Sequence, residues 1–333
     1  MTPSRLPPVW FERPVLPELA KTVAAACTIL GPATDDDPSA GVATAVAAVA
    51  GSARYDGAFL DRAPHLKVIA RTGIGYDGVD VAAATRRGIA VCNTPGAPTV
   101  STAEHAVTLM LLVAKNVHAA ESALRTGASR GYYIRHEGIE LDGKVLGLVG
   151  FGRIARHVAR IATGLGMRVA VFDPYIASSA VPAGIGRVDA LDALLREADV
   201  VSVHVPLTEA SRGMFGAAQF GSMKPTAVFI NTARGGLVDT DALLDALQTG
   251  RLFGAGLDVT LPEPLPTRHP LLHRNDVVVT PHVASATADG KARIFRVAFQ
   301  QAIDVIEGRR PEHLVNPEVW ERFASAANAG VGT

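Results

Sequence analysis

Six short apolar runs between residues 144 and 282 constrain the fold more than any other feature of the chain. The runs lack the apolar–polar alternation of half-exposed strands, and segments with helical periodicity separate them. Continuous apolar strands that alternate with helices are typical of a parallel sheet covered on both faces. The runs are VLGLVG, RVAVF, DVVSVH, AVFIN, LFGAGLD and DVVVTPH. This pattern predicts an α/β protein.

A second, smaller wound sheet is expected before residue 100, where the runs CTIL, AAVAG, LKVIA and IAVCN occur. The turn-forming stretch Asn93–Thr102 precedes a long helical pattern that begins near Ser101, with Glu104 as its capping-box acid, and this indicates a crossing between domains. A helix over about residues 288–307 follows the last run, and we expect the terminal segment to return to the first domain. The expected domains are 1–100 with 287–333, and 101–286.

The composition excludes several classes of partner. The 333 residues contain 32 Lys and Arg against 32 Asp and Glu, with no long basic run, which argues against binding to nucleic acid or an anionic membrane surface. We expect no signal peptide and no membrane-spanning helix. The two cysteines, Cys27 and Cys92, have no metal-ligand spacing, so we expect a reduced, metal-free protein in the cytoplasm.

Glycine or a polar residue follows each apolar run of the second domain. The carboxyl ends of parallel strands meet at one edge of a sheet, where open α/β sheets bind their ligands. We therefore expect these positions to converge on one site: Gly150–Gly152, Asp173, His204, Thr232–Arg234, Asp258 and Thr280–His282.

The sequence G-F-G-R-I-A at residues 150–155 follows the first of these runs and opens a helix. Gly150 permits a tight turn, Gly152 lets the backbone approach a pyrophosphate, and Ala155 allows close packing of helix on strand. Asp173 comes 23 positions after Gly150 (173 − 150), near the spacing of the acid that binds ribose hydroxyls. Taken alone, Asp173 has the alternative role of a turn or helix-capping acid. Together, the two features predict a dinucleotide site, and the carboxylate favours NAD over NADP because it repels a 2′-phosphate.

Three segments resemble the signatures of the D-2-hydroxyacid dehydrogenase family: INTARGG at 230–236, LDVTLPEPLP at 257–266 and TPHVASAT at 280–287. The resemblance extends from about residue 45 to 319. It implies an NAD-dependent oxidoreductase that transfers a hydride between nicotinamide and C2 of a D-2-hydroxy or 2-oxo acid. It also implies a Rossmann NAD-binding domain inserted in a flavodoxin-like substrate domain.

The resemblance assigns Arg234, Glu263 and His282 as the catalytic set, and their separations of 29 (263 − 234) and 19 (282 − 263) fit the family. His282 would be the general acid and base, and Glu263 would pair with its imidazole. Arg234 would bind the substrate carboxylate and the developing alkoxide. The alternative roles are a surface histidine for His282, a solvated turn acid for Glu263 and a helix-capping charge for Arg234. Relatives that oxidise formate carry Gln in place of the acid, so Glu263 favours a hydroxy acid.

The resemblance also implies the ligand contacts. Asp258 would hold the nicotinamide carboxamide, and Val205 and Pro206 would lie beneath the adenine. The full set of expected cofactor contacts is Thr102, Gly150, Gly152, Arg153, Ile154, Asp173, His204, Val205, Pro206, Thr232, Ala233, Asp258 and Ser285.

The substrate would be bound by backbone amides near Gly73, Ile74 and Gly75, together with Arg234 and His282. The alternative for the three-residue loop is a glycine-rich turn. The roles of Arg54 and Arg71 stay open between an anionic substrate tail and the protein surface. Tyr132, Tyr133 and Arg135 lie in a segment that helps form a dimer arm in the family, so we expect a homodimer.

The substrate side chain stays open between two subgroups of the family. GKVLGLVGFGRIA and FDPY resemble phosphoglycerate dehydrogenases, as a short form without a regulatory domain. LDVTLPEPLP also resembles glyoxylate and hydroxypyruvate reductases. An alternative from another class is an NAD-sensing protein similar to C-terminal-binding proteins, with little turnover.

Overall fold

The computed structural model describes residues 6–32, 37 and 39–321 of the chain. The chain divides into two compact units, one that runs to Pro98 and resumes at Thr287, and one that comprises Thr99–Ala286. The corresponding boundaries expected from the sequence are 100/101 and 286/287.

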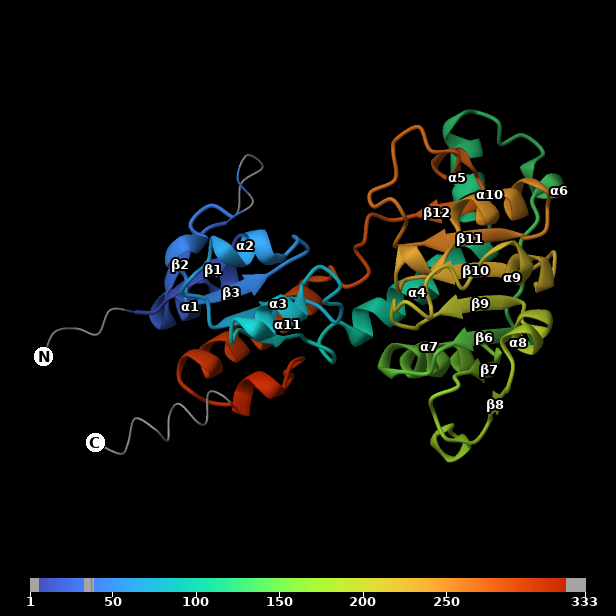
Figure 1. Cartoon of the computed structure of the whole chain (residues 1–333). Coiled ribbons are helices and arrows are strands. Elements are labelled where there is room, and N and C mark those ends of the chain that lie inside the picture. Colours follow the sequence, from blue (N-terminus) through green and yellow to red (C-terminus); the bar gives the residue numbers. More distant parts are fainter. Residues whose placement is uncertain (1–5, 33–36, 38, 322–333) are drawn as a thin grey trace, which may run out of the picture. The chain divides into compact units, whose positions relative to one another are not determined.

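Five parallel strands form the sheet of the first unit across its described residues (Figure 1). Their order is β2-β1-β3-β4-β5, the flavodoxin-like order. The strands are β1 (Pro8–Phe11), β2 (Thr28–Leu30), β3 (Ala47–Ala50), β4 (Val68–Arg71) and β5 (Ala90–Cys92). The sequence analysis did not identify β1, because this four-residue strand begins at the second of two adjacent prolines and has no helical segment before it.

Helices cover both faces of this sheet. One face packs against α1 (Ala20–Ala26) and α11 (Ala288–Ile306), and the other against α2 (Gly57–Asp61) and α3 (Val81–Arg86). Short 3-10 turns, η1 (Pro17–Leu19) and η2 (Val42–Thr44), connect the elements.

The segment after α11 packs on the first unit. The side-chain Oδ1 of Asn316 accepts the N–H of Val91 at 2.8 Å, and its Nδ2 donates to the carbonyl of Ile89 at 2.9 Å. Gln301 donates to the carbonyl of Asn93 and accepts the N–H of His313. Both amides are buried, so these bonds fix the terminal segment in register with β5.

Seven parallel strands form the sheet of the second unit across the described residues, and their labels in Figure 1 follow the order β12-β11-β10-β9-β6-β7-β8. This is the Rossmann order with one added edge strand, and the order reverses between β6 and β9. The strands are β6 (Val145–Val149), β7 (Arg168–Phe172), β8 (Ile185–Arg187), β9 (Val200–Val203), β10 (Val228–Asn231), β11 (Gly254–Leu257) and β12 (Val277–Val279).

The second sheet also lies between two helical layers, each with its own apolar core. One core involves α4 (Thr99–Ala114) and α7 (Arg153–Gly164). The other involves α8 (Leu191–Glu197), α9 (Ala217–Ser222) and α10 (Thr240–Gln248). The connections include η3 (Ser178–Ala180), η4 (Gly235–Leu237) and η5 (Pro270–His273).

One detail of the sequence prediction is wrong. Helix α4 begins at Thr99 rather than near Ser101, so Glu104 lies beyond the first turn and is exposed. Its carbonyl accepts the hydroxyl of Thr108 at 2.8 Å, as in a helix interior. The earlier start therefore removes the capping box expected from Glu104.

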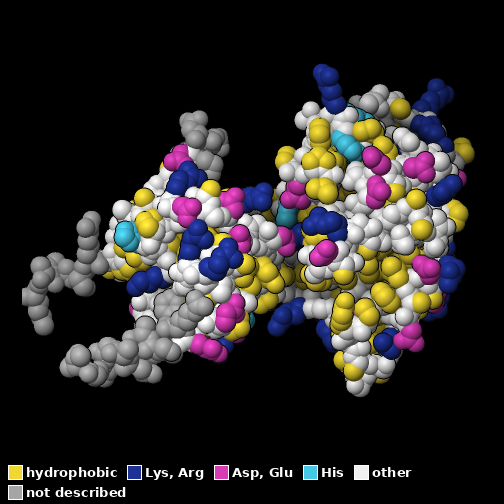
Figure 2. Space-filling model, viewed as in Figure 1, with side chains coloured by type: hydrophobic (Ala, Val, Ile, Leu, Met, Phe, Trp, Pro, Cys, Tyr) yellow, Lys and Arg dark blue, Asp and Glu magenta, His cyan; other side chains and the backbone are white. Residues whose placement is uncertain are grey.

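Two short helices, α5 (Val117–Arg125) and α6 (Tyr132–Arg135), bury none of their residues. Figure 2 shows Lys and Arg side chains interspersed with Asp and Glu on the visible face of the second unit. Within the described ranges, no helix is long and apolar enough to cross a membrane.

Candidate active site

The six polar or glycine positions expected at strand ends all lie at one edge of the second sheet. Because neighbouring strands of this sheet are parallel and paired in register, their carboxyl ends align. Gly150, Asp173, His204, Thr232, Asp258 and Thr280 each come directly after a strand. This edge includes the point between β6 and β9 where the strand order reverses.

His282 and Glu263 form a pair at this edge. Nδ1 of His282 lies 2.6 Å from Oε1 of Glu263, and the side chains are 47% and 39% exposed. The backbone of His282 has a left-handed φ of 54°, a conformation that costs a non-glycine residue about 1–3 kcal/mol and needs support from its surroundings. With Nδ1 bonded to a carboxylate, Nε2 is the nitrogen that can exchange a proton with a ligand.

The carboxyl group of Glu263 is poised to stay ionised. Burial opposes its ionisation, but the hydrogen bond and charge of His282, with contributions from the N–H of Thr260 and the charge of Arg234, hold its pKa below the ordinary value. An ionised Glu263 can accept a hydrogen bond from Nδ1–H of the imidazole beside it. The pair can therefore hold and release a proton.

Arg234 follows β10 in a turn fixed by Asn231. The buried side chain of Asn231 accepts the N–H of Ala233 at 2.9 Å and donates to the carbonyl of Arg234 at 2.8 Å. The positive charge of Arg234 is among the causes that lower the pKa of Glu263. The three predicted catalytic residues are thus brought to one side of the second unit.

Gly235 determines how closely the Arg234 turn approaches the Glu263 loop. A Cβ at Gly235 would lie 2.0 Å from the carbonyl oxygen of Thr260 and 2.7 Å from the backbone N of Leu261. These are backbone atoms, so no side chain can rotate away to make space. Only glycine allows the two loops to pack at this distance.

The loop after β6 has the features of a phosphate-binding turn. Gly150 has a φ of +87°, and a Cβ there would lie 2.8 Å from both the carbonyl oxygen of His204 and Cγ1 of Val205. Gly152 is the N-cap of α7, and no described atom lies within 4 Å of its Cβ position. A ligand can therefore approach the backbone at Gly152 closely, and the N-terminus of this 12-residue helix favours an anion.

Asp173 is held in place beside this loop. Its Oδ2 accepts the N–H of Phe151 and its Oδ1 accepts the N–H of Tyr175, both at 2.9 Å. Each oxygen has further acceptor capacity for a ribose hydroxyl. The turn role and the ribose role considered for Asp173 are thus compatible with each other.

The other expected cofactor contacts surround the same edge, and they fit a dinucleotide. The Oγ1 of Thr232 is buried and lacks a hydrogen-bond partner among the described atoms, so this hydroxyl can form a hydrogen bond with a ligand. Val205 and Ala233 pack on one core, and Ile154 packs on the other. Thr102 is buried in α4, Arg153 begins α7, and Pro206 and Ser285 lie in the loops after His204 and His282.

His204 is neutral in this setting. Burial lowers the pKa of its imidazole to about 4, and its Nε2 lies 2.8 Å from the hydroxyl of Ser202. A neutral imidazole at a strand end suits a packing or hydrogen-bonding role better than proton transfer at neutral pH.

Asp258 has protein partners on both carboxylate oxygens. Oδ1 accepts the hydroxyl of Thr280 at 2.6 Å and the N–H of Val283 at 2.8 Å, and Oδ2 accepts the N–H of Ala284 at 2.8 Å. His105, on α4, lies 2.9 Å from the hydroxyl of Thr280. The sequence analysis did not select His105, because a single histidine in a helical pattern gives no signal of its partners.

The first unit holds the expected substrate loop by its carbonyl groups. The carbonyls of Gly73, Ile74 and Gly75 accept the N–H of Thr94 at 2.9 Å, the side chain of Asn93 at 2.8 Å and Nε of Arg71 at 3.0 Å. Because a carbonyl and the N–H of the same peptide point in opposite directions, the N–H groups of Ile74 and Gly75 face away from these anchors. Arg71 supports the loop.

Arg54 and Arg135 are exposed. The side chain of Arg54 is 84% exposed and lies 3.6 Å from Asp56. Arg135 donates to the carbonyls of Ala128 and Arg130 and lies over the ring of Tyr132, within the segment that carries α6. All three contacts of Arg135 are local.

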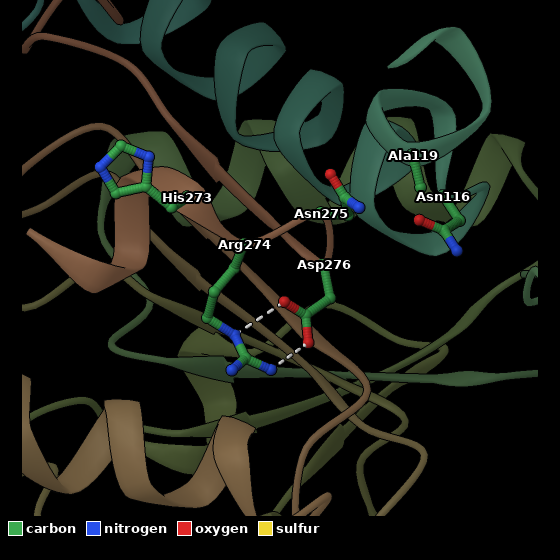
Figure 3. Close-up of a pocket in the computed structure, with 6 residues that line it drawn as sticks. All are labelled: Asn116, Ala119, His273, Arg274, Asn275 and Asp276. Atoms are coloured by element: carbon green, nitrogen blue, oxygen red, sulfur yellow. Dashed lines mark hydrogen bonds and ion pairs between the residues drawn. The ribbon is translucent and has the colours of Figure 1, made fainter. Parts of the chain in front are cut away.

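A separate polar pocket of about 440 Å³ lies at the opposite edge of the sheet (Figure 3). Its lining residues Arg274 and Asp276 precede β12, whereas Thr280 follows it. The guanidinium of Arg274 is occupied by both carboxylate oxygens of Asp276, at 2.9 and 2.7 Å. This pocket is distinct from the strand-end site. The described residues also contain no cluster of His, Cys, Asp and Glu suited to a metal ion.

Comparison with known proteins matches this chain to dehydrogenases and reductases. Residues 107–284 match the family described as D-isomer specific 2-hydroxyacid dehydrogenase, NAD binding domain. The chain is 38% identical over 264 residues to a D-3-phosphoglycerate dehydrogenase of Archaeoglobus fulgidus, which covers 79% of this chain and 50% of that protein. It is 39% identical over 272 residues to a glyoxylate reductase of Aeropyrum pernix, which covers 80% and 81%. The chain thus spans half the length of the first relative.

Among solved structures, a protein of Thermus thermophilus superposes with a TM-score of 0.85 and 39% identity, covering 92% of this chain and 99% of that one.

Proposed function

The chain belongs to the D-isomer specific 2-hydroxyacid dehydrogenase family of NAD-dependent oxidoreductases, and on this premise we propose that it interconverts a small 2-oxo acid and its D-2-hydroxy acid at the edge that carries Arg234, Glu263 and His282. The observation that carries the proposal is the bond of 2.6 Å between Nδ1 of His282 and Oε1 of Glu263. This bond orients Nε2 as a proton donor and acceptor.

NAD(H), when bound, supplies or accepts the hydride at C2 of the substrate. In the reductive direction, His282 donates the proton on Nε2 to the carbonyl oxygen, and Glu263 stabilises the charged imidazole before this transfer. In the oxidative direction, the neutral Nε2 accepts the hydroxyl proton. General acid–base catalysis of this kind contributes about 10²–10⁴-fold to the rate.

Arg234 binds the carboxylate of the substrate and the oxygen on which negative charge develops. A planar guanidinium suits both tasks, because it can donate two parallel hydrogen bonds and cannot be deprotonated. In the first unit, we propose that the N–H groups of Ile74 and Gly75 bind the same class of carboxylate, because the anchored carbonyls of their loop turn these donors outward.

The cofactor contacts stay those expected from the family, with Asp173 at the adenosine ribose. The acceptor capacity on its fixed oxygens supports NAD over NADP. Glyoxylate, hydroxypyruvate and phosphohydroxypyruvate are the substrates we propose first, since relatives of this chain are named for reactions on glyoxylate and phosphoglycerate.

The test is NADH oxidation, followed by absorbance, with these three acids, pyruvate and bulkier 2-oxo acids. We expect turnover that His282→Ala lowers by about 10²-fold or more. The matched control is His273→Ala, at an exposed histidine outside the site. Wild-type protein that binds NADH but reduces none of the acids would overturn the proposal and favour an NAD-sensing protein instead.

We also propose that the protein is a homodimer that uses the exposed α5–α6 segment, since this segment buries none of its own residues and is the family's dimer arm. The cytoplasm stays our prediction for its compartment.

A further inference from the structure

The buried carboxylate of Asp258 organises the backbone on both sides of the proposed general acid. Its side chain is 0% exposed. The Oδ atoms accept the N–H groups of Val283 and Ala284, and the backbone carbonyl of Asp258 accepts the N–H of His282 at 2.8 Å. One residue therefore binds three consecutive N–H groups. This arrangement supports the left-handed backbone of His282, which is otherwise unfavourable.

The direction of the hydrogen bonds behind Asp258 identifies the residue that supplies them. Thr280 has a single hydroxyl proton, and it donates this proton to Oδ1 of Asp258 at 2.6 Å. Nε2 of His105 lies 2.9 Å from the same hydroxyl oxygen and 3.4 Å from Oδ1 of Asp258, so this nitrogen must be the donor. The result is a directed chain from His105 Nε2–H to Thr280 Oγ1–H to Asp258 Oδ1. Consecutive hydrogen bonds of this kind strengthen one another in a buried setting.

The electrostatics favour a charged Asp258. Burial opposes ionisation, but the hydrogen bonds of His105, Thr280, Val283 and Ala284 outweigh it and hold the pKa of the carboxyl below the ordinary value. An ionised carboxylate is the stronger acceptor for the two loop N–H groups. His105 contributes to this from a different element, because it lies on α4 whereas the other groups lie in the loops after β11 and β12.

We propose that His105 is a positioning residue for the reaction: its Nε2–H, both directly and through Thr280, fixes the carboxylate of Asp258, and that carboxylate holds the 280–284 loop so that His282 meets Glu263. The catalytic consequence rests on the proposed function. The effect on the loop does not, because it concerns only this chain's own contacts.

The alternative is that His105 is a partly buried histidine whose packing matters and whose donor does not. The two roles differ in one property, which is whether a different side chain with an N–H near the position of Nε2 can replace the imidazole. His105→Gln keeps such a donor, and His105→Leu removes it. Thr280→Ser keeps the hydroxyl, and Thr280→Val removes it with little change in shape.

The first readout is turnover with NADH and whichever 2-oxo acid the wild-type protein reduces best. We expect His105→Leu and Thr280→Val each to lower kcat by about tenfold, as expected for one buried hydrogen bond. His105→Gln and Thr280→Ser should restore most of the rate. The double variant His105→Leu/Thr280→Val should lose less than the product of the two single losses, because both side chains act on the same carboxylate. Thr108→Val, at an exposed threonine of α4, is the control.

The second readout is amide hydrogen exchange of the peptide that contains Val283 and Ala284, which needs no substrate. We expect faster exchange in His105→Leu and Thr280→Val, and wild-type exchange in His105→Gln. Absence of turnover in the wild-type protein would contradict the proposed function alone, and the exchange data would still test the loop. Equal losses in His105→Leu and His105→Gln, or wild-type rates and exchange in His105→Leu, would overturn the positioning role. If His105→Leu does not fold, the Thr280 pair decides in the same way.

Discussion

Nδ1 of His282 lies 2.6 Å from Oε1 of Glu263, and the two residues come from loops that follow adjacent strands, β12 and β11. The carboxylate thus sets which imidazole nitrogen faces a ligand. It also supplies the negative charge that a protonated imidazole needs in a half-buried place. The pair is the smallest unit of the site whose chemistry can be tested by itself.

Glu263→Gln keeps the shape of the acid and removes its charge. We expect kcat/KM for reduction to fall by about 10²-fold, because a neutral amide replaces the charge-assisted hydrogen bond to the imidazole. The measurement is kcat/KM for reduction, with the exposed Glu209→Gln as control. Full activity in Glu263→Gln would remove Glu263 from the catalytic pair.

Gly235→Ala tests how far the site depends on two loops in close contact. The new Cβ would meet the carbonyl oxygen of Thr260 at 2.0 Å, so the backbone must move and displace Arg234 from Glu263. We expect kcat to fall more than about tenfold. The control is Gly164→Ala near the end of α7, where no described atom lies within 4 Å and a gain of up to about 1 kcal/mol in stability is expected. Full activity in Gly235→Ala would show that the loops tolerate separation.

Asp173→Ser tests the cofactor preference. The substitution removes a fixed negative charge from beside the glycine turn, so the ratio of kcat/KM with NADH to that with NADPH should fall by at least about tenfold. Asp189→Ser, at an acid 85% exposed after β8, should leave the ratio unchanged. An unchanged ratio in Asp173→Ser as well would place this carboxylate away from the ribose.

Much of this site is predictable from the sequence, because strand ends in a parallel sheet must share an edge. The apolar runs predict β6, β7 and β9–β12. The position of the residue after each run, at the carboxyl end of its strand, then follows without knowledge of tertiary contacts. The strands that escaped prediction, β1 and β8, are short and follow prolines or a 3-10 turn, so their periodicity is weak.

Contacts between elements distant in sequence could not be predicted. Nothing near His105 indicates Thr280, which is 175 positions away, and nothing near Gly235 indicates the carbonyl of Thr260. These relationships depend on how α4 and the loops pack on the sheet. A sequence pattern encodes the face that a residue occupies, but it does not encode the partner that it meets there.

The partly buried imidazole of His204 should make stability depend on pH. Its pKa falls from 6.5 to about 4 on folding, so above pH 6.5 the group is neutral in both states. As the pH falls from 6.5 toward 4, the unfolded chain binds a proton that the folded chain does not, and the free energy of unfolding decreases by up to about 3 kcal/mol. We expect the urea midpoint to fall less in His204→Gln than in the wild-type protein between neutral and mildly acid pH. Equal decreases would show that the imidazole is solvated.

The last prediction concerns the proposed dimer. Tyr133 and Ile134 of α6 are 95% and 89% exposed, and Leu124 of α5 is 68% exposed. Burial of apolar side chains of this size by a second chain stabilises a dimer.

Analytical ultracentrifugation should give twice the chain mass of 34.7 kDa for the wild-type protein. The Leu124→Glu/Ile134→Glu variant should sediment as a monomer, because a dimer would bury unpaired charges. Tyr175→Ser, which removes an aromatic ring 91% exposed outside this segment, should remain dimeric. A wild-type monomer, or a dimer that survives both glutamates, would show that these helices do not form the interface.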